Sequence, residues 1–254
     1  MRKGQDKMIS AEALHFAYGK KKVLDGVDFV LPSGTLTAVC GVNGCGKSTL
    51  LKCLCRLVKP DAGIAKLDER RLDTLSRREV AQQVAFMSQE CGYGGNFTVA
   101  ELAAMGRYAF GGGDDRKIIA EALALAGVEK LRSRRISSLS GGERQRAFLA
   151  LALAQTPAVL LLDEPFSALD PAAVRELTGV LLALKAEKKM SIVMVVHDLN
   201  LALHSADILL GLQAGKVAFC APPEECADAL PELFFLPQEL LQSGSDGRKY
   251  LFPC

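Results

Sequence analysis

Residues Gly41 to Thr49 read Gly-Val-Asn-Gly-Cys-Gly-Lys-Ser-Thr, which fits the pattern G-x-x-x-x-G-K-[ST] of a phosphate-binding loop. In such a loop, backbone N–H groups surround a phosphate, while Lys47 reaches the terminal phosphates and Ser48 reaches Mg²⁺. Glycines are required because a Cβ would obstruct the tight turn around the anion. The predicted phosphate-binding residues are Gly41, Val42, Asn43, Gly44, Cys45, Gly46, Lys47, Ser48 and Thr49.

The neighbouring segments supply the context that such a loop needs. The apolar run Leu36–Cys40 is typical of a buried strand that enters the loop, and apolar positions at helical spacing continue from Leu50 to Leu57. This strand, loop and helix order disfavours the alternative that the stretch is merely a glycine-rich turn.

Composition excludes several classes of protein. The chain has 254 residues, of which 49% are apolar, and a net charge of +2, so it suits a globular protein and not a general nucleic-acid binder. Its eight cysteines show no zinc-like spacing, which indicates reduced thiols in a cytosolic protein. No segment approaches the roughly 20 apolar residues of a membrane span, and the polar start is no signal peptide.

Short apolar runs alternate with helical patterns, which predicts a parallel sheet covered by helices. The expected strands are Leu36–Cys40, Val84–Met87, Ala158–Leu162 and Ile192–Val196. We expect antiparallel strands between Ser10 and Leu31, separated at Gly19 and Gly26, and a helical insertion between Gln89 and Pro157 that opens with the capping box Thr98–Glu101. The expected domains are an ATP-binding core with a β subdomain (about 1–90 and 157–220), a helical subdomain (91–156) and a C-terminal segment (221–254).

Two carboxylates follow the apolar strand that ends at Leu162. Asp163 and Glu164 should therefore lie at the carboxyl end of the sheet beside the phosphate-binding loop. Asp163 is suited to bind Mg²⁺ through water. Glu164 is suited to act as the general base that accepts a proton from the attacking water when the phosphate chain is hydrolysed. Next, Asp170 and Pro171 form a helix start, with Asp as the N-cap and Pro in the first turn.

The stretch Ser140-Gly141-Gly142-Glu143 has two interpretations. Ser140 and Glu143 have the spacing of a capping box, and this alone explains the sequence. Two glycines at a helix start also expose backbone N–H groups to a phosphate. Because the chain already has one phosphate-binding loop, this second one suits a partner's nucleotide, which predicts a head-to-tail dimer that encloses two ATP molecules.

With these motifs the chain resembles the ATPase subunit of ATP-binding-cassette transporters over essentially its whole length, and residues 139–146 match that family's signature string. The resemblance implies a P-loop NTPase (RecA-like) fold and ATP hydrolysis with Mg²⁺. It also implies that Tyr18 stacks on adenine, that Gln89 contacts the metal and senses the membrane partner, and that His197 touches the γ-phosphate. The alternatives are an ordinary aromatic at Tyr18, a polar strand end at Gln89 and a structural histidine at His197.

Further stretches resemble cassettes for iron-chelate, haem and cobalamin uptake. They are Phe97–Leu102, Met105–Tyr108 and His197–Ala202; Phe166, where many relatives have Thr, departs from the pattern. The resemblance implies a peripheral protein on the cytoplasmic face of the membrane. Its implied partners are permease subunits, a second copy of itself and, indirectly, an extracytoplasmic binding protein. Zinc or manganese import, a soluble non-transport cassette and thiol sensitivity at Cys45 remain alternatives.

Overall fold

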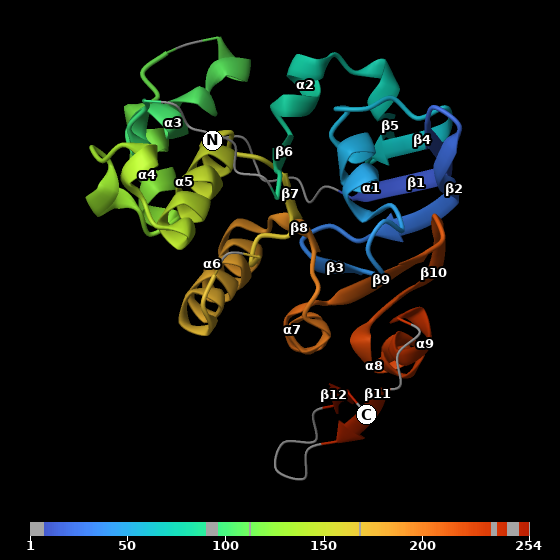
Figure 1. The fold of residues 1–254 in the computed structure, drawn as a ribbon. Coiled ribbons are helices and arrows are strands. Elements are labelled where there is room, and N and C mark those ends of the chain that lie inside the picture. The colour runs from blue at the N-terminus through green and yellow to red at the C-terminus, as the bar shows by residue number, and fades with distance from the viewer. Residues whose placement is uncertain are drawn as a thin grey trace.

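The computed structural model describes residues 8–89, 96–111, 113–167, 169–234, 238–242 and 249–253. Within these residues a central, mostly parallel sheet is covered by helices and joined by a smaller antiparallel sheet (Figure 1). The predicted α/β class is therefore confirmed. The central sheet has the strand order β10 (Lys216–Ala221), β9 (Ile208–Gln213), β3 (Leu36–Cys40), β8 (Ser191–Val195), β7 (Val159–Asp163) and β6 (Val84–Met87).

Strands β9, β3, β8, β7 and β6 run parallel to one another, and the edge strand β10 is antiparallel to β9. Every residue of β3, β7 and β8 is buried, which explains why these strands are continuous apolar runs. Side chains alternate between two cores, so Ala38 packs in one and Val39 in the other. The expected bounds of β7 and β8 were wrong by one residue at each end. The two strands pair from Val159 with Ser191 to Asp163 with Val195.

The antiparallel sheet has the order β2 (Lys21–Leu31), β1 (Ile9–Tyr18), β4 (Ala62–Leu67) and β5 (Arg70–Arg71). The turn at Gly19 is confirmed, whereas the break predicted at Gly26 is wrong. Gly26 lies inside β2 with φ +72°, and the register shifts there because Leu14 pairs with Val27 while His15 pairs with Asp25. Gly26 is thus the extra residue of a β-bulge and does not end the strand.

Helix α1 (Lys47–Leu54) follows the phosphate-binding loop and is shorter than expected. Its end is set by Arg56, which has φ +57°. The Arg56 N–H donates to Cys53 O at 3.1 Å and the Leu57 N–H donates to Lys52 O at 2.9 Å. These two bonds form a Schellman motif, which ends the helix. The apolar spacing in the sequence continues to Leu57, beyond the end of the helix itself.

The helices between β6 and β7 pack together on one side of the central sheet, opposite the antiparallel sheet (Figure 1). Capping boxes begin two of them, at Thr98 with Glu101 and at Ser140 with Glu143, as predicted. The domain boundaries at about residues 90 and 157 stay a prediction. The elements of this region are α3 (Val99–Met105), η2 (Tyr108–Phe110), α4 (Arg116–Leu125), η3 (Glu129–Leu131), η4 (Ile136–Ser138) and α5 (Gly141–Ala154).

The remaining elements flank the central sheet or follow it. Asp170 caps its helix by accepting from the N–H groups of Ala172 and Ala173, as predicted. No helix among the described residues is both long and apolar enough to cross a membrane. These elements are η1 (Leu72–Thr74), α2 (Arg77–Ala81), α6 (Pro171–Lys188), α7 (Leu199–Ser205), α8 (Pro223–Cys226), η5 (Ala227–Ala229), α9 (Leu230–Phe234), β11 (Gln238–Gln242) and β12 (Lys249–Pro253).

Candidate functional site

The predicted phosphate-binding loop joins β3 to α1 and is wedged between two other strands. Gly41 has φ +148°, and a Cβ there would lie 2.2 Å from the carbonyl oxygen of Leu212 at the end of β9. Gly46 is the N-cap of α1 with φ +117°, and a Cβ there would lie 2.9 Å from Val23 O in β2. Neither position has room for a side chain, so glycine is needed at both. With glycines there, the backbone can fold into the tight turn that surrounds a phosphate.

Lys47 lies inside this loop. The residue is 6% exposed, and its Nζ donates to Gly41 O at 2.7 Å and to Val42 O at 3.1 Å. The N-terminal end of α1 provides a positive partial charge beside the ammonium group. Asn43 and Gly44 are exposed at the tip of the loop. The loop therefore presents positive charge and backbone N–H groups, which suit a bound phosphate chain.

Ser48 and Asp163 have the donor groups of a magnesium site. Ser48 Oγ donates to Asp163 Oδ1 at 2.9 Å, so hydroxyl and carboxylate oxygens meet beside the loop, and Mg²⁺ prefers such ligands. Burial raises the pKa of the Asp163 carboxyl, although the hydrogen bond from Ser48 lowers it. A bound cation would offset the unfavourable burial of this carboxylate, so the two residues fit Mg²⁺.

The side chain of Glu164 contacts Gln89 and His197, two of the three residues whose roles the family resemblance implied. Gln89 Nε2 donates to Glu164 Oε2 at 2.6 Å, and His197 Nε2 lies 2.6 Å from Glu164 Oε1. Gln89 follows β6, Glu164 follows β7 and His197 follows β8, and these three strands are neighbours. The carboxyl ends of parallel strands share one sheet edge, so residues far apart in the sequence converge there. The contact of Gln89 with Mg²⁺ stays a prediction.

The backbone of Glu164 has φ +51°, a left-handed conformation that non-glycine residues adopt at a cost. This conformation turns the chain sharply after β7. A cavity of about 220 Å³ lies beside Glu164 and His197 and is also lined by Phe166 and Ser167. A cavity of this size has room for water, which a general base at Glu164 would need nearby.

Tyr18 ends β1 and is half exposed. Its ring meets Phe16 edge-on, with the centroids 4.8 Å apart. It pairs with Lys21 across the hairpin, and Val23 in the second strand of this hairpin lies against Gly46. The exposed ring is thus carried by the hairpin that borders the phosphate-binding loop, and its stacking on adenine stays a prediction.

Ser140, Gly141 and Gly142 lie at the start of α5, where Ser140 and Gly141 are exposed. Figure 1 shows α5 and α1 on different sides of strands β6 and β7. The helix that these three residues begin thus lies apart from the helix that follows the phosphate-binding loop of the same chain.

Six described cysteines are free thiols, and Cys91 and Cys254 lie outside the described residues. Within the described residues no group of three or more His, Cys, Asp and Glu side chains could hold a metal ion. Cys45 is buried, and burial raises the pKa of its thiol despite the nearby Lys47. Because the thiolate is the reactive form, this environment favours the plain packing role of Cys45 over thiol sensitivity.

Sequence reasoning missed one residue of this site. Gln145 in α5 is buried, and its Nε2 donates to the backbone oxygen of Glu164 at 3.4 Å. The signal was present, because Gln145 is a polar residue on the buried side of a helix whose following residues are mostly apolar.

Comparison with known proteins places these features in context. A family model described as ABC transporter matches residues 24–167. The chain is 41% identical to the hemin import ATP-binding protein HmuV of Pseudomonas aeruginosa, over 86% of this chain and 88% of that protein. It is 37% identical to the ferric enterobactin transport ATP-binding protein FepC of Escherichia coli, over 87% and 84%. A solved inward-facing structure of a metal-chelate type ABC transporter superposes with a TM-score of 0.83 at 27% identity, covering 98% of both chains.

Proposed function

The chain belongs to the ABC transporter family, and we propose that it is the ATP-hydrolysing subunit of an importer for iron chelates or haem. ATP-binding subunits of this family are ATPases. The observation that carries the catalytic assignment is the convergence of Gln89, Glu164 and His197 beside the phosphate-binding loop. The named relatives that import hemin and ferric enterobactin support the choice of cargo.

In the proposed reaction, the loop and Lys47 hold the phosphates of ATP. Ser48 and Asp163 would hold Mg²⁺, which when bound neutralises charge on the phosphates. Glu164 accepts a proton from the attacking water, while Gln89 and His197 fix the two oxygens of its carboxylate. The short distances from both neighbours suit a base whose orientation must be set before the reaction.

We further propose that two copies enclose two ATP molecules. Ser140 and Gly141 are exposed at the N-terminus of α5, and Figure 1 shows this helix and α1, which follows the phosphate-binding loop, on different sides of β6 and β7. The backbone N–H groups of Ser140 and Gly141 and the positive end of a 14-residue helix suit a phosphate. In a head-to-tail dimer they would contact the nucleotide held by the other copy.

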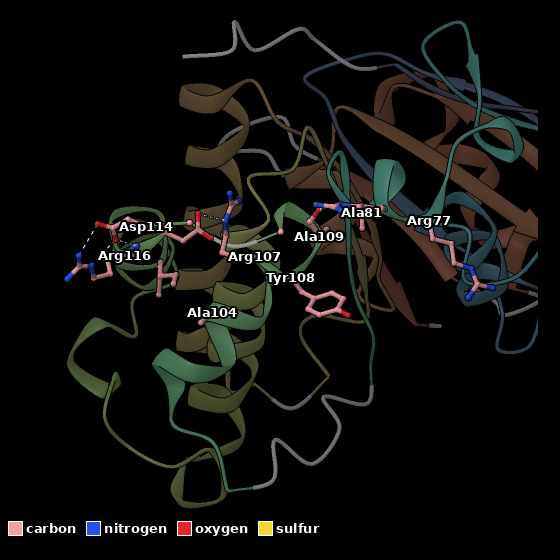
Figure 2. A pocket seen from close by; sticks show the side chains of 13 residues that line it. Arg77, Ala81, Ala104, Arg107, Tyr108, Ala109, Asp114 and Arg116 are labelled. Atoms are coloured by element: carbon pink, nitrogen blue, oxygen red, sulfur yellow. Dashed lines mark hydrogen bonds and ion pairs between the residues drawn. The ribbon is translucent and has the colours of Figure 1, made fainter.

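The permease partner has a suitable docking surface between α2 and the η2–α4 region. There a pocket of about 1230 Å³ is lined by both segments, and in Figure 2 the ring of Tyr108 projects into its open space. Tyr108 is 92% exposed. Helix α2 is followed directly by β6 and then by Gln89. A partner that contacts α2 would therefore bind a segment that leads straight to the catalytic site.

Charge at this pocket favours a partner with an acidic residue. Arg107 pairs with Asp115 at 3.1 Å and Arg116 pairs with Asp114 at 2.8 Å. Among the described residues Arg77, which is exposed, has no ion-pair partner. We propose that a cytoplasmic helix of the permease docks here, with apolar side chains on Tyr108 and a carboxylate near Arg77.

Tyr108→Ala is expected to leave the ATPase activity of the detached subunit within about twofold of wild type and to lower permease-dependent transport roughly tenfold. The pocket that holds Tyr108 is lined by none of Gln89, Glu164 and His197, so the substitution is expected to remove partner contacts alone. Uptake and basal ATP turnover would be measured in parallel, with Val30→Ala as the control because Val30 is also an exposed apolar residue. Unchanged transport by Tyr108→Ala would remove the pocket from the docking surface.

The cargo is tested by uptake in cells that lack this chain. Labelled ferric siderophore, haem, cobalamin, zinc and manganese are supplied, and the cells are complemented with wild type or Glu164→Gln. We expect uptake of a ferric siderophore or of haem to be restored by wild type and not by the variant. Restoration of zinc or manganese uptake alone would overturn the cargo, and uptake of all five without the chain would overturn the importer proposal.

A further inference from the structure

The backbone oxygen of Glu164 has two donors from different parts of the chain. One is the N–H of Ser167 in the same turn, at 3.3 Å. The other is Nε2 of Gln145, at 3.4 Å, which comes from α5. With Gln89 and His197 on its carboxylate, Glu164 is thus held at both its side chain and its backbone.

Glu164 needs such support because its backbone is left-handed, with φ +51°. Residues persist in this conformation only where the surrounding structure fixes them. The Ser167 bond lies within the turn itself, so it moves with the turn. The Gln145 bond instead ties the backbone of Glu164 to a separate element, helix α5.

Gln145 is placed for this task at a cost to its own hydrogen bonding. Gln145 as a whole residue is 5% exposed, and its side-chain Oε1 has no hydrogen-bond partner among the described residues. A buried, unpaired amide oxygen is unfavourable for folding. An apolar side chain of the same size would avoid that cost, so packing alone does not explain a glutamine here.

The start of α5 also packs against the segment that follows Glu164. A Cβ on Gly142 would lie 3.1 Å from Cδ2 of Leu169. Helix α5 and the turn after β7 are therefore in contact at Gly142 as well as at Gln145, three residues apart and nearly one turn of the helix.

We propose that Gln145 is a positioning residue, which fixes the backbone of Glu164 against α5 so that its carboxylate stays in reach of the attacking water. This inference rests on the proposed role of Glu164 as the base. Helix α5 begins with the residues proposed to contact the nucleotide of the second copy. Through Gln145, the position of Glu164 at the chain's own ATP site would therefore depend on the helix that contacts the second copy's ATP.

The test compares Gln145→Met with wild type in steady-state ATP hydrolysis. Methionine keeps the volume of the side chain and removes both the donor and the unpaired oxygen. We expect kcat to fall roughly 10- to 100-fold, while KM for ATP stays within about twofold and Tm equals or exceeds that of wild type. Leu149→Met is the control, since Leu149 is buried on the same helix and should match wild type in all three.

Two further variants make the result decisive. If Gln145→Met does not fold, Gln145→Asn makes the same comparison, because its amide is one methylene too short to reach the Glu164 oxygen. A folded variant with kcat within twofold of wild type, or a loss of kcat matched by an equal rise in KM and a fall in Tm, overturns the inference. Glu164→Gln is assayed beside them: if it turns over ATP normally, the base assignment fails and the inference with it, whereas an inactive Glu164→Gln beside a normal Gln145→Met overturns the inference alone.

Discussion

A chain carrying Glu164→Gln is expected to bind ATP with nearly the wild-type affinity and to lose at least about 100-fold in turnover. The amide has the size of the carboxylate but cannot accept a proton from water. It also cannot accept from both neighbours, since Gln89 Nε2 and His197 Nε2 each lie 2.6 Å from a carboxylate oxygen, and one of these oxygens becomes an NH₂ group. Phosphate release and the binding of a fluorescent ATP analogue would measure the two quantities separately.

The same variant tests the proposed dimer. If two copies close around ATP and reopen only after hydrolysis, Glu164→Gln should remain dimeric by light scattering as long as ATP is present. Glu176→Gln is the matched control, because Glu176 is an exposed carboxylate in α6 that pairs with Arg146, and the amide oxygen of a glutamine can still accept from that guanidinium. Turnover near wild type in Glu164→Gln would remove Glu164 from the role of base.

The sequence predicted the parts of the fold whose signal is local. Strands β3, β7 and β8 are buried on both faces, so they appear as uninterrupted apolar runs. The starts of α3 and α5 follow from Ser or Thr with Glu three residues later. Strand β9 was missed although it is equally apolar, because a short apolar run resembles part of a buried helix.

The features that escaped prediction depend on tertiary contacts. Gly26 looks like a strand break in sequence, and only the partner strand shows that it is a bulge. The contact of Gln145 with Glu164 joins residues from different elements, and its register cannot be obtained from either segment alone. The convergence of Gln89 and His197 on Glu164 was anticipated only in part, since the strand order supplies their adjacency while the side-chain contacts depend on the left-handed backbone of Glu164.

Lys47→Ala is expected to weaken ATP binding roughly 10- to 100-fold, the range for losing hydrogen bonds to a charged group. The ammonium group is buried inside the loop, where charge interactions are stronger than at the surface. Lys52→Ala is the control, since it removes the same charge from the same helix outside the loop and should leave affinity within about twofold. The measurement is titration with a fluorescent ATP analogue in the presence of Mg²⁺.

The stability of Lys47→Ala separates loss of the ligand contact from loss of the loop. Lys47 Nζ bonds the Gly41 and Val42 carbonyls, so its removal leaves two acceptors to water, and a modest fall in Tm is expected without nucleotide. Gly41 and Gly46 still pack closely against the backbone of Leu212 and Val23, so the loop should keep its shape. Added ATP should then raise the Tm of wild type and of Lys52→Ala but hardly that of Lys47→Ala. Normal ATP affinity and a normal Tm shift in Lys47→Ala would contradict the assignment of this loop to the phosphates.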